Sequence, residues 1–109
     1  MIIFYVAHPY SGKQENKDKV EAIIKKKLTL DPVNLYISPI HTLGWYYDDV
    51  EYLKGIDKCF ALLLRCDVLM LCEGWELSAG CRAEKAYAEK YGIPIMTYHE
   101  NMDKAESEG

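Results

Sequence analysis

The chain has 109 residues, of which 50% are hydrophobic and 28% are charged, and its formal net charge is −4. This length is enough for one compact domain with one core. The acidic balance argues against duplex nucleic acid as a partner, because the chain lacks the basic excess that neutralises a phosphate backbone, but it permits a small anionic ligand held locally.

The hydrophobic runs of the chain are short. Residues 61–64 and 68–72 are among the longest, and they fall far short of the roughly 20 apolar residues that span a bilayer. The N-terminus has no signal-peptide pattern. The sequence therefore predicts a cytoplasmic protein that makes no contact with a membrane.

The four cysteines are separated by 7, 6 and 9 residues, with no C-x-x-C pair and no histidine at ligand spacing. Because zinc sites usually show such spacing, we expect no zinc site. Each cysteine lies in an apolar or helical pattern, where a free thiol behaves as a small buried hydrophobe. Reduced core thiols are therefore expected at Cys59, Cys66, Cys72 and Cys81.

In the first half of the chain, an apolar run at residues 2–7 predicts a buried strand that enters a loop at Pro9. Residues 14–30 show helical periodicity, with a solvated charged face and a buried face of Val20, Ile23, Ile24 and Leu28. Residues 33–37 predict a second strand, which Ser38 and Pro39 end.

The second half begins with residues 40–49, which include Tyr46, Tyr47, Asp48 and Asp49 and have no clean period, so we expect a loop over the site. Helical spacing at residues 52–65 precedes a strand at 68–72. A helix is expected from 79 to 91, where Gly92 stops it, followed by a strand at 93–97. The polar segment 99–109 is expected to be a flexible tail.

Alternating strands and helices predict an α/β fold, a three-layer αβα sandwich around a parallel, flavodoxin-like or Rossmann-like sheet of four to five strands, in a single domain of residues 1–98. Such sheets bind ligands at the carboxyl ends of their strands. Three loops leave those ends, at residues 7–13, 38–49 and 73–78, and they hold most of the unusual polar and aromatic residues.

The stretch EGWELSAGCRAE at residues 73–84 combines a helix start with a misplaced carboxylate. Ser78 is a good N-cap and Gly80 lies in the first turn, so the free backbone N–H groups can hold an anion. Farther along, Glu84 shares a face with Cys81 and Ala88 and interrupts an apolar stripe. It therefore has partners, a raised pKa or access to a pocket, unless the helix is turned so that Glu84 lies in solvent at the rim.

Other polar and aromatic residues have two interpretations each. In YVAHPYSGK, residues 5–13, Gly12 and Lys13 resemble part of a phosphate loop, but G-x-x-x-x-G-K-[ST] is absent, which argues against a Walker nucleoside triphosphatase. His8 is an ordinary loop histidine or a ligand contact. Trp75 is a packing residue or an aromatic wall for a base.

The segments FYVAHPYSG and CDVLMLCEGWELSAGCRAEKAYAEKYGIPI, together with the size of the chain, resemble the nucleoside 2-deoxyribosyltransferase-like superfamily. The resemblance is greatest to its small bacterial and phage members of undefined function (DUF4406-like). It covers most of the chain, and its most specific part is G-W-E-x-S-x-G-x-x-x-E at residues 74–84.

The resemblance implies roles for individual residues. Glu84 matches the nucleophilic glutamate, Tyr5 matches a tyrosine that hydrogen-bonds the nucleophile, and Asp57 matches the acidic residue that assists the departing base. Ser78 matches a serine that binds the phosphate or the 5′ end of the sugar. Ser11 and Gly12 lie where the first loop touches the sugar or phosphate.

The implied chemistry is attack of the Glu84 carboxylate on C1′ of a 2′-deoxynucleoside or its 5′-monophosphate, with release or exchange of the base and without a metal or organic cofactor. The alternative is a noncatalytic nucleotide-binding module, because His8 stands where the superfamily usually has glycine. The expected partner is a small nucleoside or nucleotide, and the resemblance also implies a homodimer.

Overall fold

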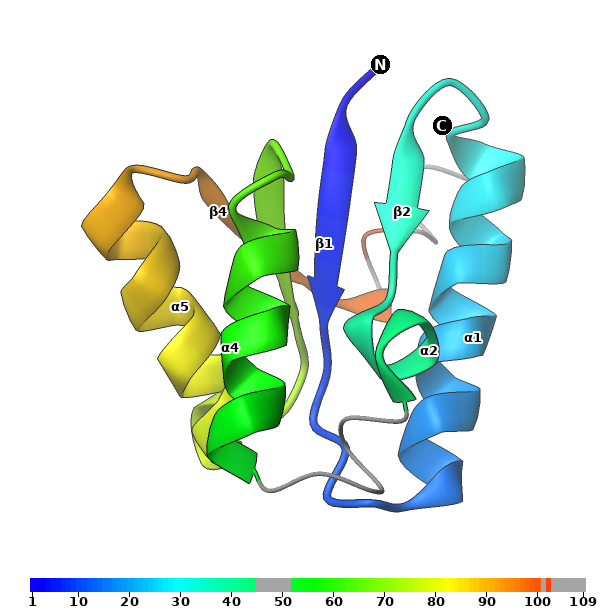
Figure 1. The fold of residues 1–109 in the computed structure, drawn as a ribbon. Helices are drawn as coiled ribbons and strands as arrows, with labels where there is room; N and C mark the ends of the chain where they lie inside the picture. Colours follow the sequence, from blue (N-terminus) through cyan, green and yellow to red (C-terminus); the bar gives the residue numbers. More distant parts are fainter. Residues whose placement is uncertain (45–51, 101, 103–109) are drawn as a thin grey trace.

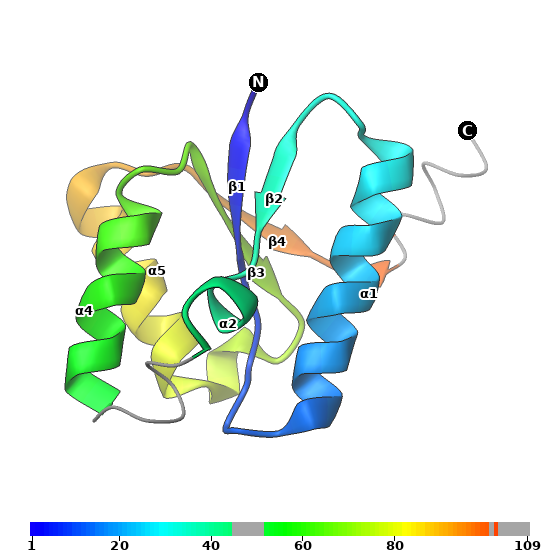
Figure 2. The same cartoon turned by 45° about the vertical axis from the view of Figure 1, so that its right-hand side comes forward.

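A parallel sheet lies between helices on its two faces in the computed structural model, which describes residues 1–44, 52–100 and 102 (Figures 1 and 2). Strands β1 (Ile3–Ala7), β2 (Leu35–Ile37), β3 (Val68–Cys72) and β4 (Ile95–Tyr98) are ordered β2-β1-β3-β4. All three strand pairings are parallel. Helix α1 (Gln14–Leu30) covers one face, and α4 (Tyr52–Leu63) and α5 (Ala79–Tyr91) cover the other. The predicted fold class is confirmed.

The two faces of the sheet contribute to two hydrophobic clusters, because successive strand side chains point to opposite faces. Tyr5 and Leu69 are paired in register and belong to the cluster under α4 and α5. Val6 and Met70 are the next pair, and they belong to the cluster under α1 with Val20. Tyr5 therefore lies on the face of the sheet that α5 covers, and α5 carries Glu84.

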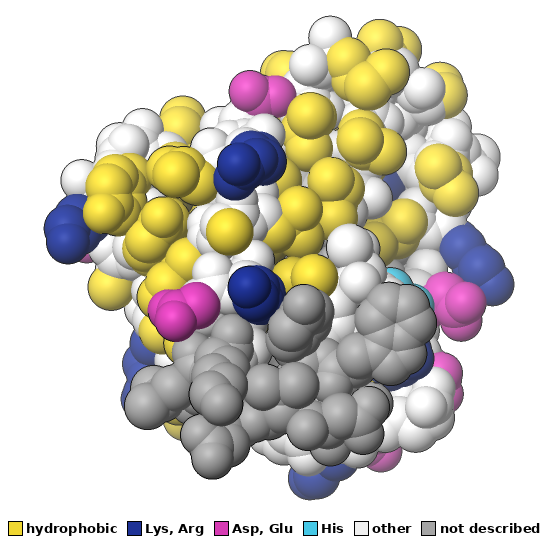
Figure 3. Space-filling view, in the orientation of Figure 1, with side chains coloured by type: hydrophobic (Ala, Val, Ile, Leu, Met, Phe, Trp, Pro, Cys, Tyr) yellow, Lys and Arg dark blue, Asp and Glu magenta, His cyan; other side chains and the backbone are white. Residues whose placement is uncertain are grey.

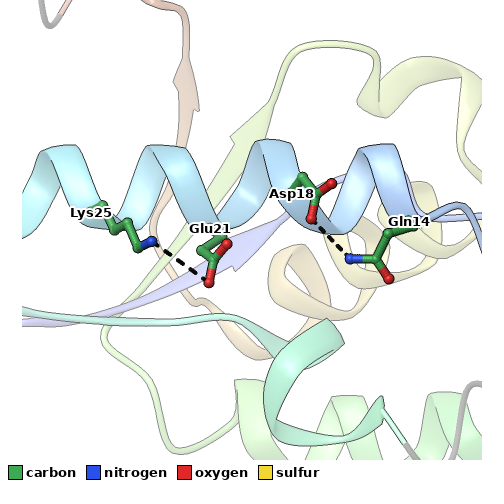
Figure 4. A network of polar contacts seen from close by, with 4 residues as sticks. All are labelled: Gln14, Asp18, Glu21 and Lys25. Atoms are coloured by element: carbon green, nitrogen blue, oxygen red, sulfur yellow. Dashed lines mark hydrogen bonds and ion pairs between the residues drawn. The ribbon is translucent and has the colours of Figure 1, made fainter.

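Helix α1 has the predicted bounds, but its buried face differs from the prediction. Leu28 is 62% exposed, whereas Lys27 is only 5% exposed, with its Nζ 5.2 Å from the centroid of the Tyr98 ring. The aliphatic stem and charge of a lysine can both contact an aromatic ring, which makes this burial possible. The outward face carries a Gln14–Asp18 hydrogen bond and a Glu21–Lys25 ion pair, as predicted for a solvated surface (Figure 4).

Part of the segment predicted as a loop at residues 40–49 is helical. Helix α2 (Pro39–Thr42) is capped by Ser38, whose hydroxyl oxygen accepts the N–H of His41. Ile40 of this helix is buried in the cluster under α1. Proline is favourable in the first turn, because its missing N–H is not needed there. The Tyr46, Tyr47, Asp48 and Asp49 cluster lies outside the described residues.

The remaining elements agree closely with the predicted ones. Strand β3 and helix α5 have the predicted bounds, whereas β2 starts two residues later and β4 is shifted toward Tyr98. Gly92 ends α5 with a φ of 70°, which glycine adopts without strain. The cysteine prediction is confirmed, because all four thiols are free and buried. No helix in the described part of the chain is both long and apolar enough to cross a membrane.

Candidate functional site

The strand order reverses between β1 and β3, and the loops at their carboxyl ends form the candidate site. From β1 the chain passes through α1 to β2 on one side, and it later enters β3 on the other side of β1. Crevices at such switch points are the usual ligand sites of parallel α/β sheets. The loops gather at the lower edge of Figure 1.

The first loop makes a tight turn that exposes Ser11. Lys13 N–H donates to the carbonyl oxygen of Tyr10 at 3.0 Å, and the two central residues, Ser11 and Gly12, have φ angles of 52° and 70°. Both φ angles are those of a type I′ turn. Serine in this conformation costs about 1 kcal/mol or more, so the turn holds a strained polar residue at the site.

The loop that follows β3 packs closely on the loop that follows β1. Gly74 has a φ of 89°, and a Cβ at this position would lie 3.4 Å from Cγ of Pro9. The short helix η1 (Trp75–Leu77) follows, and then the Ser78 hydroxyl oxygen accepts the N–H of Cys81 at 3.2 Å to cap α5. The predicted N-cap at Ser78 is confirmed.

A cavity of about 700 Å³ lies between these loops and α1, within the range of small-molecule sites. His8 and Ser11 line the cavity from the loop after β1, and Ser78 lines it from the loop after β3. Helix α1 contributes Lys19 and Lys26. The two lysines are seven residues apart, which places them on one face of the helix. The α1 wall of the cavity is therefore cationic, while Glu73 and Glu100 place carboxyl groups along the same cavity.

His8 has a defined hydrogen-bonding state at the edge of this cavity. Its Nδ1 lies 2.7 Å from the carbonyl oxygen of Pro9. Burial lowers the pKa of His8 below its usual value. The hydrogen bond to Pro9 acts in the opposite direction, and the positive charge of Lys19 lowers the pKa further. The imidazole is therefore neutral near pH 7.

Glu84 is buried on the sheet-facing side of α5, with 4% of its surface exposed, beside Cys81 and Ala88. This burial excludes the alternative of a rim glutamate in solvent. Desolvation raises the pKa of Glu84 to about 7, and the polar hydroxyl of the neighbouring Tyr5 opposes that rise. Among the described residues, Glu84 Oε2 has no hydrogen-bond partner. A buried carboxyl oxygen without a partner is costly, and such groups are enriched at functional sites.

The structure brings the predicted site residues into two groups. His8, Ser11 and Ser78 line the cavity, whereas Tyr5 and Glu84 form a buried pair that does not line it. Trp75 lines a second cavity of about 450 Å³ beside it, and its ring centroid is 5.8 Å from Lys85 Nζ. The remaining three, Gly12, Gly80 and Asp57, line neither cavity, and Asp57 is exposed on α4.

Sequence reasoning missed the residues that α1 and the end of β4 contribute to the cavity. Lys19 and Lys26 were assigned to a solvated helix face, and Tyr98 and Glu100 were not considered site residues. The seven-residue spacing of the lysines was a usable signal, but the sequence does not say which face of α1 borders the strand ends. Within the part of the chain that the structure describes, no cluster of three His, Cys, Asp or Glu residues could hold a metal ion.

Residues 2–97 match the family described as Domain of unknown function (DUF4406). The chain belongs to this family. It is also similar in fold to a conserved protein from Enterococcus faecalis V583, with a TM-score of 0.72 and 21% sequence identity. The alignment covers 92% of this chain but only 65% of that one. No curated protein matches the sequence significantly.

Proposed function

We propose that this protein cleaves or exchanges the N-glycosidic bond of 2′-deoxynucleosides or their 5′-monophosphates, with Glu84 as the nucleophile. The observation that carries the proposal is the buried Glu84 carboxyl group beside Tyr5, whose Oε2 has no partner among the described residues and whose pKa is raised to about 7. The helix that carries it is capped by Ser78, which lines the cavity. The resemblance to the nucleoside 2-deoxyribosyltransferase-like superfamily supports the same assignment.

In the first step, a Glu84 carboxylate oxygen forms a bond to C1′ while the C1′–N bond breaks. The bonding electron pair leaves with the base, which takes up a proton from an acid. In the second step, water or another base attacks C1′, loses a proton and releases the Glu84 carboxylate. The mechanism requires the ionised form of Glu84 at the start of the cycle.

The other residues of the proposed mechanism bind and orient. In this mechanism the hydroxyl of Tyr5, whose side chain lowers the pKa of Glu84, donates a hydrogen bond to the ionised carboxylate and holds the attacking oxygen in place. The first turn of α5 and the two lysines of α1 provide positive potential for a 5′-phosphate, which the carboxyl groups of Glu73 and Glu100 in the same cavity partly offset. Asp57 is exposed and lines neither cavity, so the mechanism assigns it no step.

A noncatalytic nucleotide-binding module is the second candidate, and a specific observation favours it. Glu84 is almost fully buried and does not itself line the cavity, whereas Ser78 does. A ligand held at the cavity wall then meets the helix start without reaching the carboxyl group. This candidate predicts binding of the same ligands without release of base.

Turnover separates the two candidates. The protein is incubated with a panel of deoxynucleosides and monophosphates plus free adenine, and released or exchanged base is followed by chromatography. Loss of turnover in Glu84→Gln, with turnover retained in Glu89→Gln, supports the glycosidic reaction. Glu89 is a matched control, because it lies on the same helix but is exposed and paired with Lys85. Binding without any release of base selects the binding module, and no nucleotide binding at all refutes both.

We also propose a homodimer. Apolar side chains gather on the face of the molecule that carries α4, β1 and β2 (Figure 3). Strand β2 is an edge strand, and its Leu35 is 43% exposed. Exposed apolar patches are typical of protein interfaces, so we expect a second copy of the chain to pack on this face. Sedimentation analysis showing a monomer at micromolar concentration refutes the dimer.

A further inference from the structure

His8 meets the cavity with one ring nitrogen already occupied. Its Nδ1 lies 2.7 Å from the carbonyl oxygen of Pro9. A carbonyl oxygen only accepts hydrogen bonds, so Nδ1 carries the hydrogen. The ring nitrogen that remains for a ligand is Nε2.

The second nitrogen carries a lone pair. Partial burial and the neighbouring charge of Lys19 both favour the neutral ring, and the Pro9 hydrogen bond does not outweigh them. In a neutral imidazole whose Nδ1 is protonated, Nε2 is an acceptor. His8 therefore offers the cavity an uncharged hydrogen-bond acceptor.

The groups near His8 differ from it in kind. Lys19 and Lys26 donate hydrogen bonds and attract anions, and the hydroxyl of Ser11 can donate or accept. Glu73 and Glu100 also line the cavity, and as carboxylates they accept hydrogen bonds but carry a charge that His8 lacks. An anionic phosphate fits the lysine wall. It does not fit Nε2, whose lone pair repels phosphate oxygens. The cavity thus offers cationic donors to an anion and a neutral acceptor, His8, to an O–H or N–H donor.

We infer that His8 is a specificity-determining residue that accepts a hydrogen bond from a hydroxyl or amino group of the nucleoside part of the ligand, while the α1 lysines hold its anionic part. The inference rests on the proposed function, because it takes the ligand to be a nucleoside or nucleotide. His8 would select ligands with a suitably placed hydrogen-bond donor, at a position where the superfamily that this chain resembles usually has glycine and no side chain.

The test combines changes in the protein with changes in the ligand. Calorimetry measures the binding of 2′-deoxyadenosine 5′-monophosphate and 2′-deoxyadenosine, and of 2′-deoxyadenosine analogues that each lack one further donor: 2′,3′-dideoxyadenosine, 2′,5′-dideoxyadenosine and purine 2′-deoxyriboside. One analogue is expected to bind the wild type about 3- to 10-fold more weakly than 2′-deoxyadenosine, the size of one neutral hydrogen bond. In His8→Phe, which keeps a ring but no acceptor, this difference disappears, and in His8→Gln it is partly restored.

His41→Ala is the control, because His41 lies on α2 and does not line the cavity; it keeps the wild-type pattern of affinities. If every analogue responds equally in the wild type and His8→Phe, the role of His8 is refuted while nucleoside binding stands. If no probe binds the wild type, the inference is refuted, whereas the proposed function is refuted only if the wider panel of deoxynucleosides and monophosphates also fails to bind.

The ring itself can be observed without a ligand. Long-range ¹H–¹⁵N correlation spectra of the wild-type protein at pH 7 are expected to show His8 protonated at Nδ1 and unprotonated at Nε2. A proton on Nε2, in either the other neutral tautomer or the imidazolium, overturns the inference whatever the ligand experiments give. This measurement also holds if a His8 variant fails to fold.

Discussion

The burial of Glu84 predicts a pH-dependent stability that a single substitution removes. The pKa of Glu84 is about 7 in the fold, against an ordinary value of 4.5. Between these two values the unfolded chain releases the proton and the folded protein keeps it. The folded state then binds more protons, so the free energy of unfolding falls as pH rises through this window.

The size of the effect follows from the two pKa values. They differ by about 2.5, and each pKa unit corresponds to 1.36 kcal/mol, so ionised Glu84 costs about 3 kcal/mol above pH 7. This is a large share of the total stability of a small domain, which is about 5–15 kcal/mol. Glu84→Gln keeps the shape and polarity of the side chain but cannot ionise, so the cost is absent in the variant.

Urea unfolding of the wild type and Glu84→Gln from pH 4.5 to 8 measures this cost. The variant is expected to gain stability relative to the wild type as pH rises, by about 3 kcal/mol in total. Comparing the two proteins cancels the groups that titrate in both. Glu89→Gln, an exposed change on the same helix, is expected to track the wild type within about 0.5 kcal/mol at every pH. A constant difference between Glu84→Gln and the wild type would refute the argument that Glu84 is desolvated.

Three further predictions concern the site. Turnover should rise between pH 6 and 8, because only ionised Glu84 attacks C1′ and its pKa is about 7; a rate that falls over this range contradicts that role. Ser78→Ala should cost about 1 kcal/mol in thermal or urea unfolding, because α5 loses its cap; unchanged stability would show that the cap contributes nothing. Gly74→Ala and Gly92→Ala should each cost about 1 kcal/mol, because both residues have positive φ. Only Gly74→Ala should also weaken nucleotide binding, because Gly74 lines the cavity and its new Cβ contacts Pro9, whereas Gly92 does not line the cavity. Equal binding by both variants refutes the importance of Gly74 for the site.

Local sequence patterns predicted the helices and strands well where the hydrophobic periodicity agreed with the residues that cap or end an element. Helix α5 is the clearest case, because Ser78 starts it, Gly92 stops it, and the apolar spacing between them has one period. The same spacing placed Cys81, Glu84 and Ala88 on one face, and the structure buries all three. The prediction was less accurate at residues 40–49, where a four-residue helix is too short to show a period.

Helix α1 shows why periodicity alone does not define a buried face. Leu28 and Lys27 are neighbours in sequence, and hydrophobicity favours burying the leucine. The fold instead buries the lysine, because the ring of Tyr98, far along the chain, lies where its stem and charge can make contact. The sequence does not show where β4 ends relative to α1, so it could not show which side chain of α1 meets that ring.

The sequence by itself determined the alternation of strands and helices, hence the parallel α/β sheet, and it identified Glu84 as a carboxylate on an apolar stripe. These properties depend on spacing within one element or on the order of elements. Only the tertiary structure decided that Glu84 is buried beside Tyr5, that Lys19 and Lys26 border the cavity, and that Asp57 lies away from it. Each of these depends on how separate elements pack, because desolvation and cavity walls come from residues distant in sequence.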